Sequence, residues 1–108
     1  MTLSPWTTLV LAAVFETGWA VGLKFVHGPR RALAIVWVLV SLAASMVLLE
    51  RAARSIPIGT AYAVWTGLGA ACTALLGMFW LGEPVRAARV FFLVLLVGAV
   101  VGLKATAR

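Results

Sequence analysis

The sequence predicts an all-α integral membrane protein with four transmembrane helices per chain, and two observations carry this prediction. The 108 residues are 64% hydrophobic and only 11% charged. Their mean hydropathy of +1.11 far exceeds that of a soluble domain. The charges also gather between long apolar stretches, each close to the roughly 20 residues that cross a bilayer as a helix. We predict a single domain, residues 1–108, with helices at about 5–24, 32–50, 57–81 and 87–104.

The first two spans are bounded by polar, basic loops. The start of the chain, residues 1–5, has no basic segment of the kind that opens a signal peptide, so we expect the first span to be retained. Lys24, a His-Gly-Pro turn and two arginines separate this span from the second. The second span ends where Glu50 and Arg51 restore charge to the sequence.

The third apolar stretch, residues 55–82, exceeds one span, so we expect it to tilt or to leave the hydrocarbon at its ends. Pro57 suits the first turn of this helix because a proline there gives up no helical hydrogen bond. Glu83 lies at the boundary after the span and is expected to be solvated. Arg89, near the start of the fourth span, is expected to extend toward the lipid headgroups.

The basic residues divide almost evenly between the two sides of the membrane. Four Lys or Arg lie on the side of the N-terminus, the second loop and the C-terminus, and five lie on the side of the first and third loops. The two groups are Arg51, Arg54, Lys104 and Arg108, against Lys24, Arg30, Arg31, Arg86 and Arg89. So small a bias does not fix orientation. We therefore predict that the protein inserts both ways and forms an antiparallel homodimer with the inverted symmetry of larger transporters.

The net charge of +6 lies at helix ends rather than in one basic block, which favours membrane topology over nucleic-acid binding. The sequence has no metal-ligand cluster, nucleophile–base set or phosphate-binding loop. We therefore predict neither an enzyme nor a cofactor or metal site. The expected partners are the lipid bilayer, a second copy of the chain, protons and a small cation.

Glu16 is the only charge within residues 5–23. On insertion scales, a charged Asp, Lys or Arg at a helix centre costs roughly 2.5 to 3.5 kcal/mol. Every Lys and Arg lies near a helix end, so a structural ion pair with Glu16 is not expected. We predict that Glu16 binds protons and a cation in turn. Trp19, one turn later, can pack on a cation or donate its N–H to the carboxylate, although an interfacial packing role is the alternative.

The third span places two aromatic polar groups inside the membrane. Tyr62 and Trp65 share a helical face, and the Glu16 carboxylates are natural acceptors for their O–H and N–H groups. Helix packing alone is the alternative for both. Gly67 and Gly69 predict a bend in this helix or a close approach of another group.

Two further features are less specific. Ser45, inside the second span, either has a function or bonds its own i−4 carbonyl, and the residues alone do not decide. Gly98 and Gly102 form a GxxxG motif in the fourth span, which predicts close helix packing at the dimer interface.

These features together resemble the small multidrug resistance family over nearly the whole chain. The residues that carry this resemblance are Glu16, Lys24, the run PIGTAYAVWTG at 57–67 and GLKA at 102–105. Within the family the chain is similar to the guanidinium exporter subtype. The main mark is Trp19, where multidrug-exporting relatives typically carry glycine.

The resemblance implies an antiparallel dual-topology homodimer that exchanges guanidinium for protons across a bacterial inner membrane by alternating access. It implies that Glu16 is the shared substrate and proton site. It also implies that four side chains line this site or hydrogen-bond the glutamates: Trp19, Ser45, Tyr62 and Trp65. Thr17-Gly18 stands where bulkier apolar pairs also occur in the subtype, which predicts looser local packing.

Two alternatives remain beside guanidinium export. One is a broad exporter of multidrug or quaternary ammonium cations. The other is a non-transporting subunit that requires a partner chain.

Overall fold

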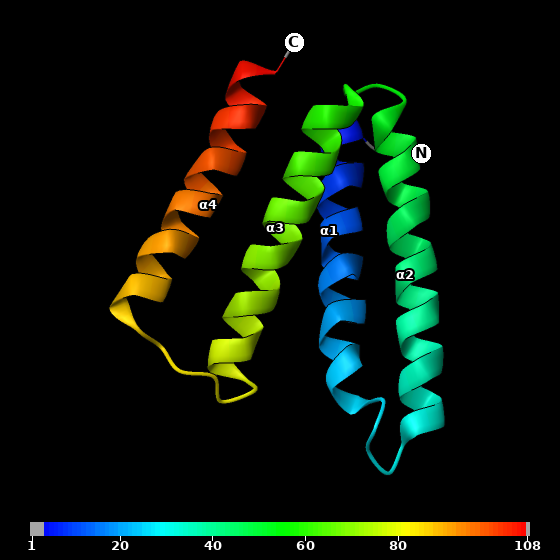
Figure 1. Cartoon of the computed structure of the whole chain (residues 1–108). Helices are drawn as coiled ribbons and strands as arrows, with labels where there is room; N and C mark the ends of the chain where they lie inside the picture. The colour runs from blue at the N-terminus through cyan, green and yellow to red at the C-terminus, as the bar shows by residue number, and fades with distance from the viewer. Residues whose placement is uncertain (1–3, 108) are drawn as a thin grey trace.

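The computed structural model describes residues 4–107, which form four long helices and one short helical turn (Figure 1). In chain order the elements are α1 (Pro5–Gly22), η1 (Leu23–Phe25), α2 (Arg31–Ala53), α3 (Ile58–Phe79) and α4 (Ala87–Thr106). The four long helices are each long and apolar enough to cross a membrane, which confirms the predicted fold class. Residues 1–3 and Arg108, which enter the predictions on the start of the chain and on charge, lie outside the described residues.

The helix ends follow local signals. The Ser4 side chain caps α1 by accepting the Thr7 amide at 3.1 Å, and Pro5 occupies the first helical position. Helix α2 runs to Ala53 rather than to about residue 50, and an ion pair between Glu50 and Arg54 spans its last turn. Helix α3 ends at Phe79 rather than at about residue 81.

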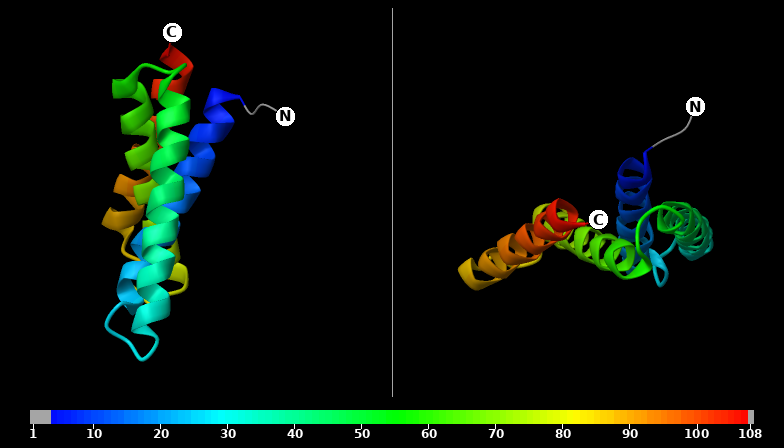
Figure 2. Two further views of the ribbon diagram at one scale, coloured as in Figure 1. Left: turned by 90° about the vertical axis from the view of Figure 1, so that its right-hand side faces the viewer. Right: turned by 90° about the horizontal axis from the view of Figure 1, so that it is seen from above.

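Helices α1, α2 and α3 form a bundle, with α1 packed against both of the others (Figures 1 and 2). The bundle core is built from small and branched apolar side chains around one tryptophan: Leu9, Ala12, Ala13, Leu49, Ala52, Ile56, Ala61, Val64 and Trp65. The start of α1, the α2–α3 loop and the end of α4 lie at one end of the molecule (Figure 1). The α1–α2 and α3–α4 loops lie at the other end, as four successive spans require.

The contact between α1 and α2 is close because two glycines on α1 admit an indole. A Cβ at Gly22 would lie 2.6 Å from Cδ1 of Trp37, and the Trp37 Nε1 donates to the carbonyl of Gly18 at 2.8 Å. The Thr17 hydroxyl donates to the carbonyls of Ala13 and Gly69, at 3.0 and 3.4 Å. Hydrogen bonds between helices therefore hold both Thr17 and Gly18, and looser packing at this pair stays a prediction.

Helix α4 lies beside α3, on the side away from α2 (Figure 2). None of its residues from Ala87 to Thr106 is buried. It packs closely on α3 at Gly67, where an added Cβ would lie 2.7 Å from Cγ2 of Val100. The chain is therefore a three-helix bundle with a fourth helix attached along one edge.

Candidate functional site

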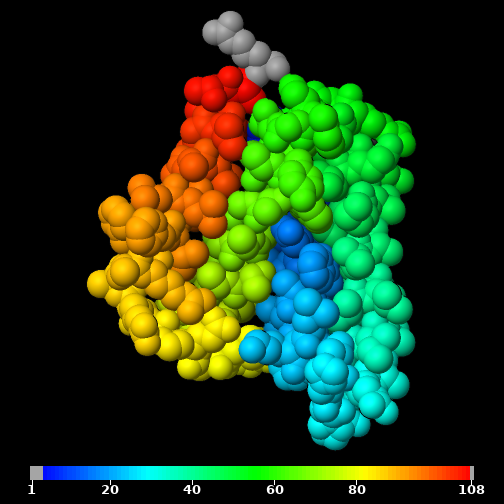
Figure 3. Space-filling model, in the orientation of Figure 1, coloured from blue at the N-terminus to red at the C-terminus, as the bar shows by residue number. Residues whose placement is uncertain are grey.

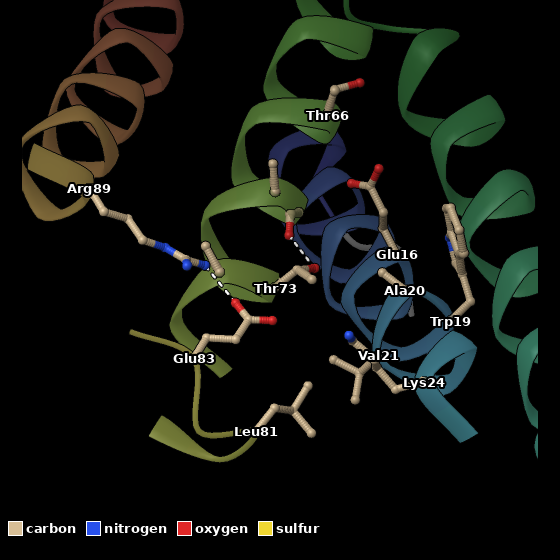
Figure 4. Close-up of a pocket in the computed structure, with 13 residues that line it drawn as sticks. Glu16, Trp19, Ala20, Val21, Lys24, Thr66, Thr73, Leu81, Glu83 and Arg89 are labelled. Carbon is tan, nitrogen blue, oxygen red and sulfur yellow. Dashed lines mark hydrogen bonds and ion pairs between the residues drawn. The ribbon is translucent and has the colours of Figure 1, made fainter. Parts of the chain in front are cut away.

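Glu16 lies in the middle of α1, half-buried, with its carboxylate against the backbone of α3. A Cβ built on Gly69 would overlap the Glu16 Oε1. Glycine at position 69 therefore makes the room in which the carboxylate lies. Figure 4 shows Glu16 pointing from α1 into the space beside α3.

Two buried polar atoms at this place are unpaired. Within residues 4–107, neither Oε1 of Glu16 nor Nε1 of Trp19 has a hydrogen-bond partner. The predicted donation from Trp19 to Glu16 is therefore not made in the single chain. Buried polar groups in proteins are nearly always paired, so an unpaired acceptor and an unpaired donor in one cavity mark a place for a polar ligand.

The cavity that both residues line has a volume of about 410 Å³ and lies between α1, α3 and the start of α4. Figure 3 shows α1 recessed between its neighbours on this face of the molecule. Small side chains form much of the wall, and the charged side chains are two acids and two bases. The lining residues are Glu16, Trp19, Ala20, Val21, Lys24, Thr66, Gly69, Ala70, Thr73, Ala74, Leu81, Glu83 and Arg89.

Ser45 and Trp65 form a hydrogen-bonded chain that joins three helices. The Trp65 Nε1 donates to the Ser45 hydroxyl at 2.9 Å, and that hydroxyl donates to the carbonyl of Ala12 at 2.6 Å. In an α-helix the same carbonyl receives the amide of residue 16. These two hydrogen bonds therefore fix the turn of α1 that carries Glu16, although neither Ser45 nor Trp65 lines the cavity.

Tyr62 does not line this cavity within the described chain. Tyr62 is 56% exposed. Its ring packs against the ring of Trp65, with the two ring centroids 5.6 Å apart. Contact of Tyr62 or Trp65 with a glutamate of a second copy stays a prediction. Helix α3 is continuous through Gly67 and Gly69, where both glycines allow close packing, and a bend there also stays a prediction.

The sequence reasoning missed Glu83. Its side chain is partly solvated, at 34% exposed, but it also accepts a hydrogen bond from Nη2 of Arg89 at 2.6 Å, a contact that was not expected (Figure 4). It lines the same cavity as Glu16. The available signal was Gly82 just before it, since a glycine at that point allows the chain to turn back toward α3.

Known protein families and sequences include relatives of this chain. The family model described as Small Multidrug Resistance protein matches residues 4–96. The chain belongs to this family. The match covers α1, where Glu16 lies, all of α3, and the loop that carries Glu83.

Several relatives of the chain are named guanidinium exporter. The relative from Yersinia pseudotuberculosis is 48% identical over 99 residues, which cover 92% of this chain and 95% of that protein. The Escherichia coli relative is 46% identical and covers 92% and 94%, and the Salmonella typhimurium relative is 42% identical over 102 residues, covering 94% and 97%.

These findings confirm the resemblance drawn from the sequence motifs. Family membership and four spanning helices make the chain a multi-pass protein of the bacterial inner membrane. The family is one of transporters, which points away from an enzyme.

Proposed function

We propose that this protein exports guanidinium in exchange for protons, with Glu16 as the shared binding group. The observation that carries the proposal is the buried, unpaired Oε1 of Glu16 in a cavity that also contains the Trp19 indole. Relatives at 41–48% identity that are named guanidinium exporter support the choice of substrate.

The chemistry of the cavity suits a small planar cation. Guanidinium is always charged and presents N–H donors in forks that match the two oxygens of a carboxylate. Trp19 offers a flat aromatic ring against which such a cation can pack. Gly69 and Ala20 carry no bulky side chain, so the cation can approach the Glu16 oxygens closely.

Coupling to protons follows from competition at one group. A proton on Glu16 removes the negative charge that holds the cation, and a bound cation excludes the proton from the same oxygens. Protons arriving from the side of higher concentration therefore release guanidinium, without a separate proton pathway. The membrane potential adds roughly 2.3 kcal/mol per elementary charge per 100 mV.

Two oppositely oriented copies complete the proposed transporter. One chain of four helices is too small to enclose an aqueous path with a gate on each side, whereas an antiparallel pair has inverted symmetry that allows alternating access. Two features support this arrangement: α4 is exposed, and the two membrane sides of the chain carry nearly equal numbers of Lys and Arg. Two Glu16 carboxylates would then share one binding chamber.

The substitution Glu16→Gln tests the proposal. It keeps the size and hydrogen-bonding shape of the side chain but removes its charge and its proton exchange. We expect guanidinium-driven proton flux in proteoliposomes to fall to background, while dimer content measured by cross-linking stays at the wild-type level. Glu50→Gln is the control, because Glu50 is exposed and lies outside the cavity. Proton-coupled transport that persists in the Glu16→Gln protein would refute the proposal.

One observation favours a second candidate, a broad exporter of bulkier cations. The cavity volume of about 410 Å³ falls in the range of pockets that hold drug-sized ligands, roughly 300 to 1,000 Å³. A transport panel on the wild-type protein separates the two functions. Flux with guanidinium but not with a large aromatic cation supports the first, and flux with the large aromatic cation supports the second, whether or not guanidinium is also carried.

A further inference from the structure

Helix α3 supports two carboxylates by the same device. Gly69 makes room for the carboxylate of Glu16, and Gly77 makes room for that of Glu83, since a Cβ on either glycine would overlap the carboxylate beside it. The two glycines are eight residues apart, which is about 12 Å along the helix. Both carboxylates line one cavity, with Glu16 deep in the bundle and Glu83 in the α3–α4 loop (Figure 4).

The loop after α3 is built to aim Glu83 at this cavity. Gly82 has a φ of +74°, a conformation that side-chain-bearing residues rarely adopt, and it turns the chain back toward α3. The amide of Glu83 then donates to the carbonyl of Gly77 at 2.9 Å. Backbone and side chain of Glu83 are therefore both held against Gly77.

Glu83 already binds a guanidinium group, that of Arg89. The contact is a single donation from Nη2 of Arg89 to Oε1 of Glu83 at 2.6 Å, and both side chains are 34% exposed. A one-point contact leaves the fork of the carboxylate incompletely used. The ion pair between Glu50 and Arg54 differs, since it joins neighbouring turns of α2, is 58% and 71% exposed, and lies outside the cavity.

We propose that Glu83 is an outer docking site at which incoming guanidinium exchanges with the side chain of Arg89 before moving to Glu16. Arg89 is then a tethered stand-in for the substrate, which keeps the Glu83 carboxylate paired when no cation is bound. This inference rests on the proposed function, because it assumes that guanidinium is the cation carried.

Opposite effects of two substitutions test the docking role. We expect Glu83→Gln to raise the KM for guanidinium uptake into proteoliposomes about fivefold, the effect of one partly exposed charged contact. We expect Arg89→Gln to lower the KM, because it removes the internal competitor. A purely structural ion pair predicts the same direction of change from both substitutions, and that result would overturn the proposal.

Two further variants separate direct contact from a general effect of charge. Glu83→Asp keeps the charge but withdraws the carboxylate from its place against Gly77, so docking predicts a raised KM and a charge effect predicts the wild-type value. In the double variant, docking predicts that Arg89→Gln has no effect once Glu83→Gln is present. A double variant with wild-type KM would show charge balance alone and would contradict docking.

The contact between the Glu83 carboxylate and Gly77 gives an independent check. Gly77→Ala is expected to displace the Glu83 carboxylate and raise the KM, whereas Gly59→Ala, on the same helix with open space around it among the described residues, leaves KM unchanged. Glu16→Gln distinguishes failure of the docking site from failure of the proposed function. Flux lost in Glu16→Gln with wild-type KM in all Glu83 variants refutes the docking site alone, and flux retained in Glu16→Gln refutes the proposed function.

Discussion

The three-helix bundle and α4 differ in what surrounds them, although all four helices are similarly apolar. Helices α1, α2 and α3 bury side chains against one another and are joined by side-chain hydrogen bonds from Thr17, Trp37, Ser45 and Trp65. Helix α4 buries no residue from Ala87 to Thr106 and packs on the edge of α3. The proposed cation site is therefore built mainly by the bundle, and α4 contributes Arg89 to the cavity lining.

This difference shows how a small chain divides two tasks. In lipid, helices associate through close packing and hydrogen bonds rather than through the hydrophobic effect. The bundle uses both to hold Glu16 in one position. The surface of α4 remains open for another helix, which fits its proposed place in the dimer.

The largest effect is expected from Gly69→Ala, which breaks the close fit between α3 and the Glu16 carboxylate. The added methyl overlaps the flexible end of Glu16, so the carboxylate moves while the helices stay in place. We expect guanidinium flux to fall at least about tenfold, since small displacements of a binding group have large effects. Normal insertion with normal flux would show that this glycine does not position Glu16, and Gly59→Ala is the matched control.

A smaller effect, on stability, is expected from Ser45→Ala. The change removes the acceptor of the buried Trp65 N–H and the link to the carbonyl of Ala12. An unsatisfied buried donor costs about 1 to 3 kcal/mol of unfolding free energy. Ser41→Ala is the control, because Ser41 is similarly buried one turn away on α2 but lies outside this chain of hydrogen bonds. Equal unfolding midpoints for the two variants in detergent would contradict the structural role of Ser45.

The spans and the importance of Glu16 could be predicted because both depend on local composition. A charge in an apolar stretch of helical length is costly wherever the helix packs, so Glu16 is conspicuous without knowledge of its neighbours. The partners of other residues could not be predicted in this way. Nothing in the sequence links Trp37 to Gly18, yet the Trp37 Nε1 donates to the Gly18 carbonyl, because the packing of α1 against α2 brings them together.

Glu83 is a second residue whose surroundings could not be predicted from the sequence. A glutamate at a span boundary is normally solvated, and the neighbouring Gly82 indicates a turn but not the cavity that Glu83 lines. Its position depends on the turn at Gly82 and on the missing side chain of Gly77, which lies in the preceding helix. Only the fold combines these two glycines, which is why the sequence did not indicate that Glu83 and Glu16 line one cavity.

The smallest effect within one chain is expected from Gly98→Ala combined with Gly102→Ala on α4. Among the described residues, an added Cβ at either position meets nothing within 4 Å, and alanine favours helix formation by up to about 1 kcal/mol per residue over glycine. We therefore expect helix content and insertion of the chain to be unchanged. If these glycines pack against a second copy, the two methyl groups separate the helices and weaken the dimer. Energy transfer between labelled chains in vesicles measures this, and dimerisation equal to wild type would assign the interface to another face of α4.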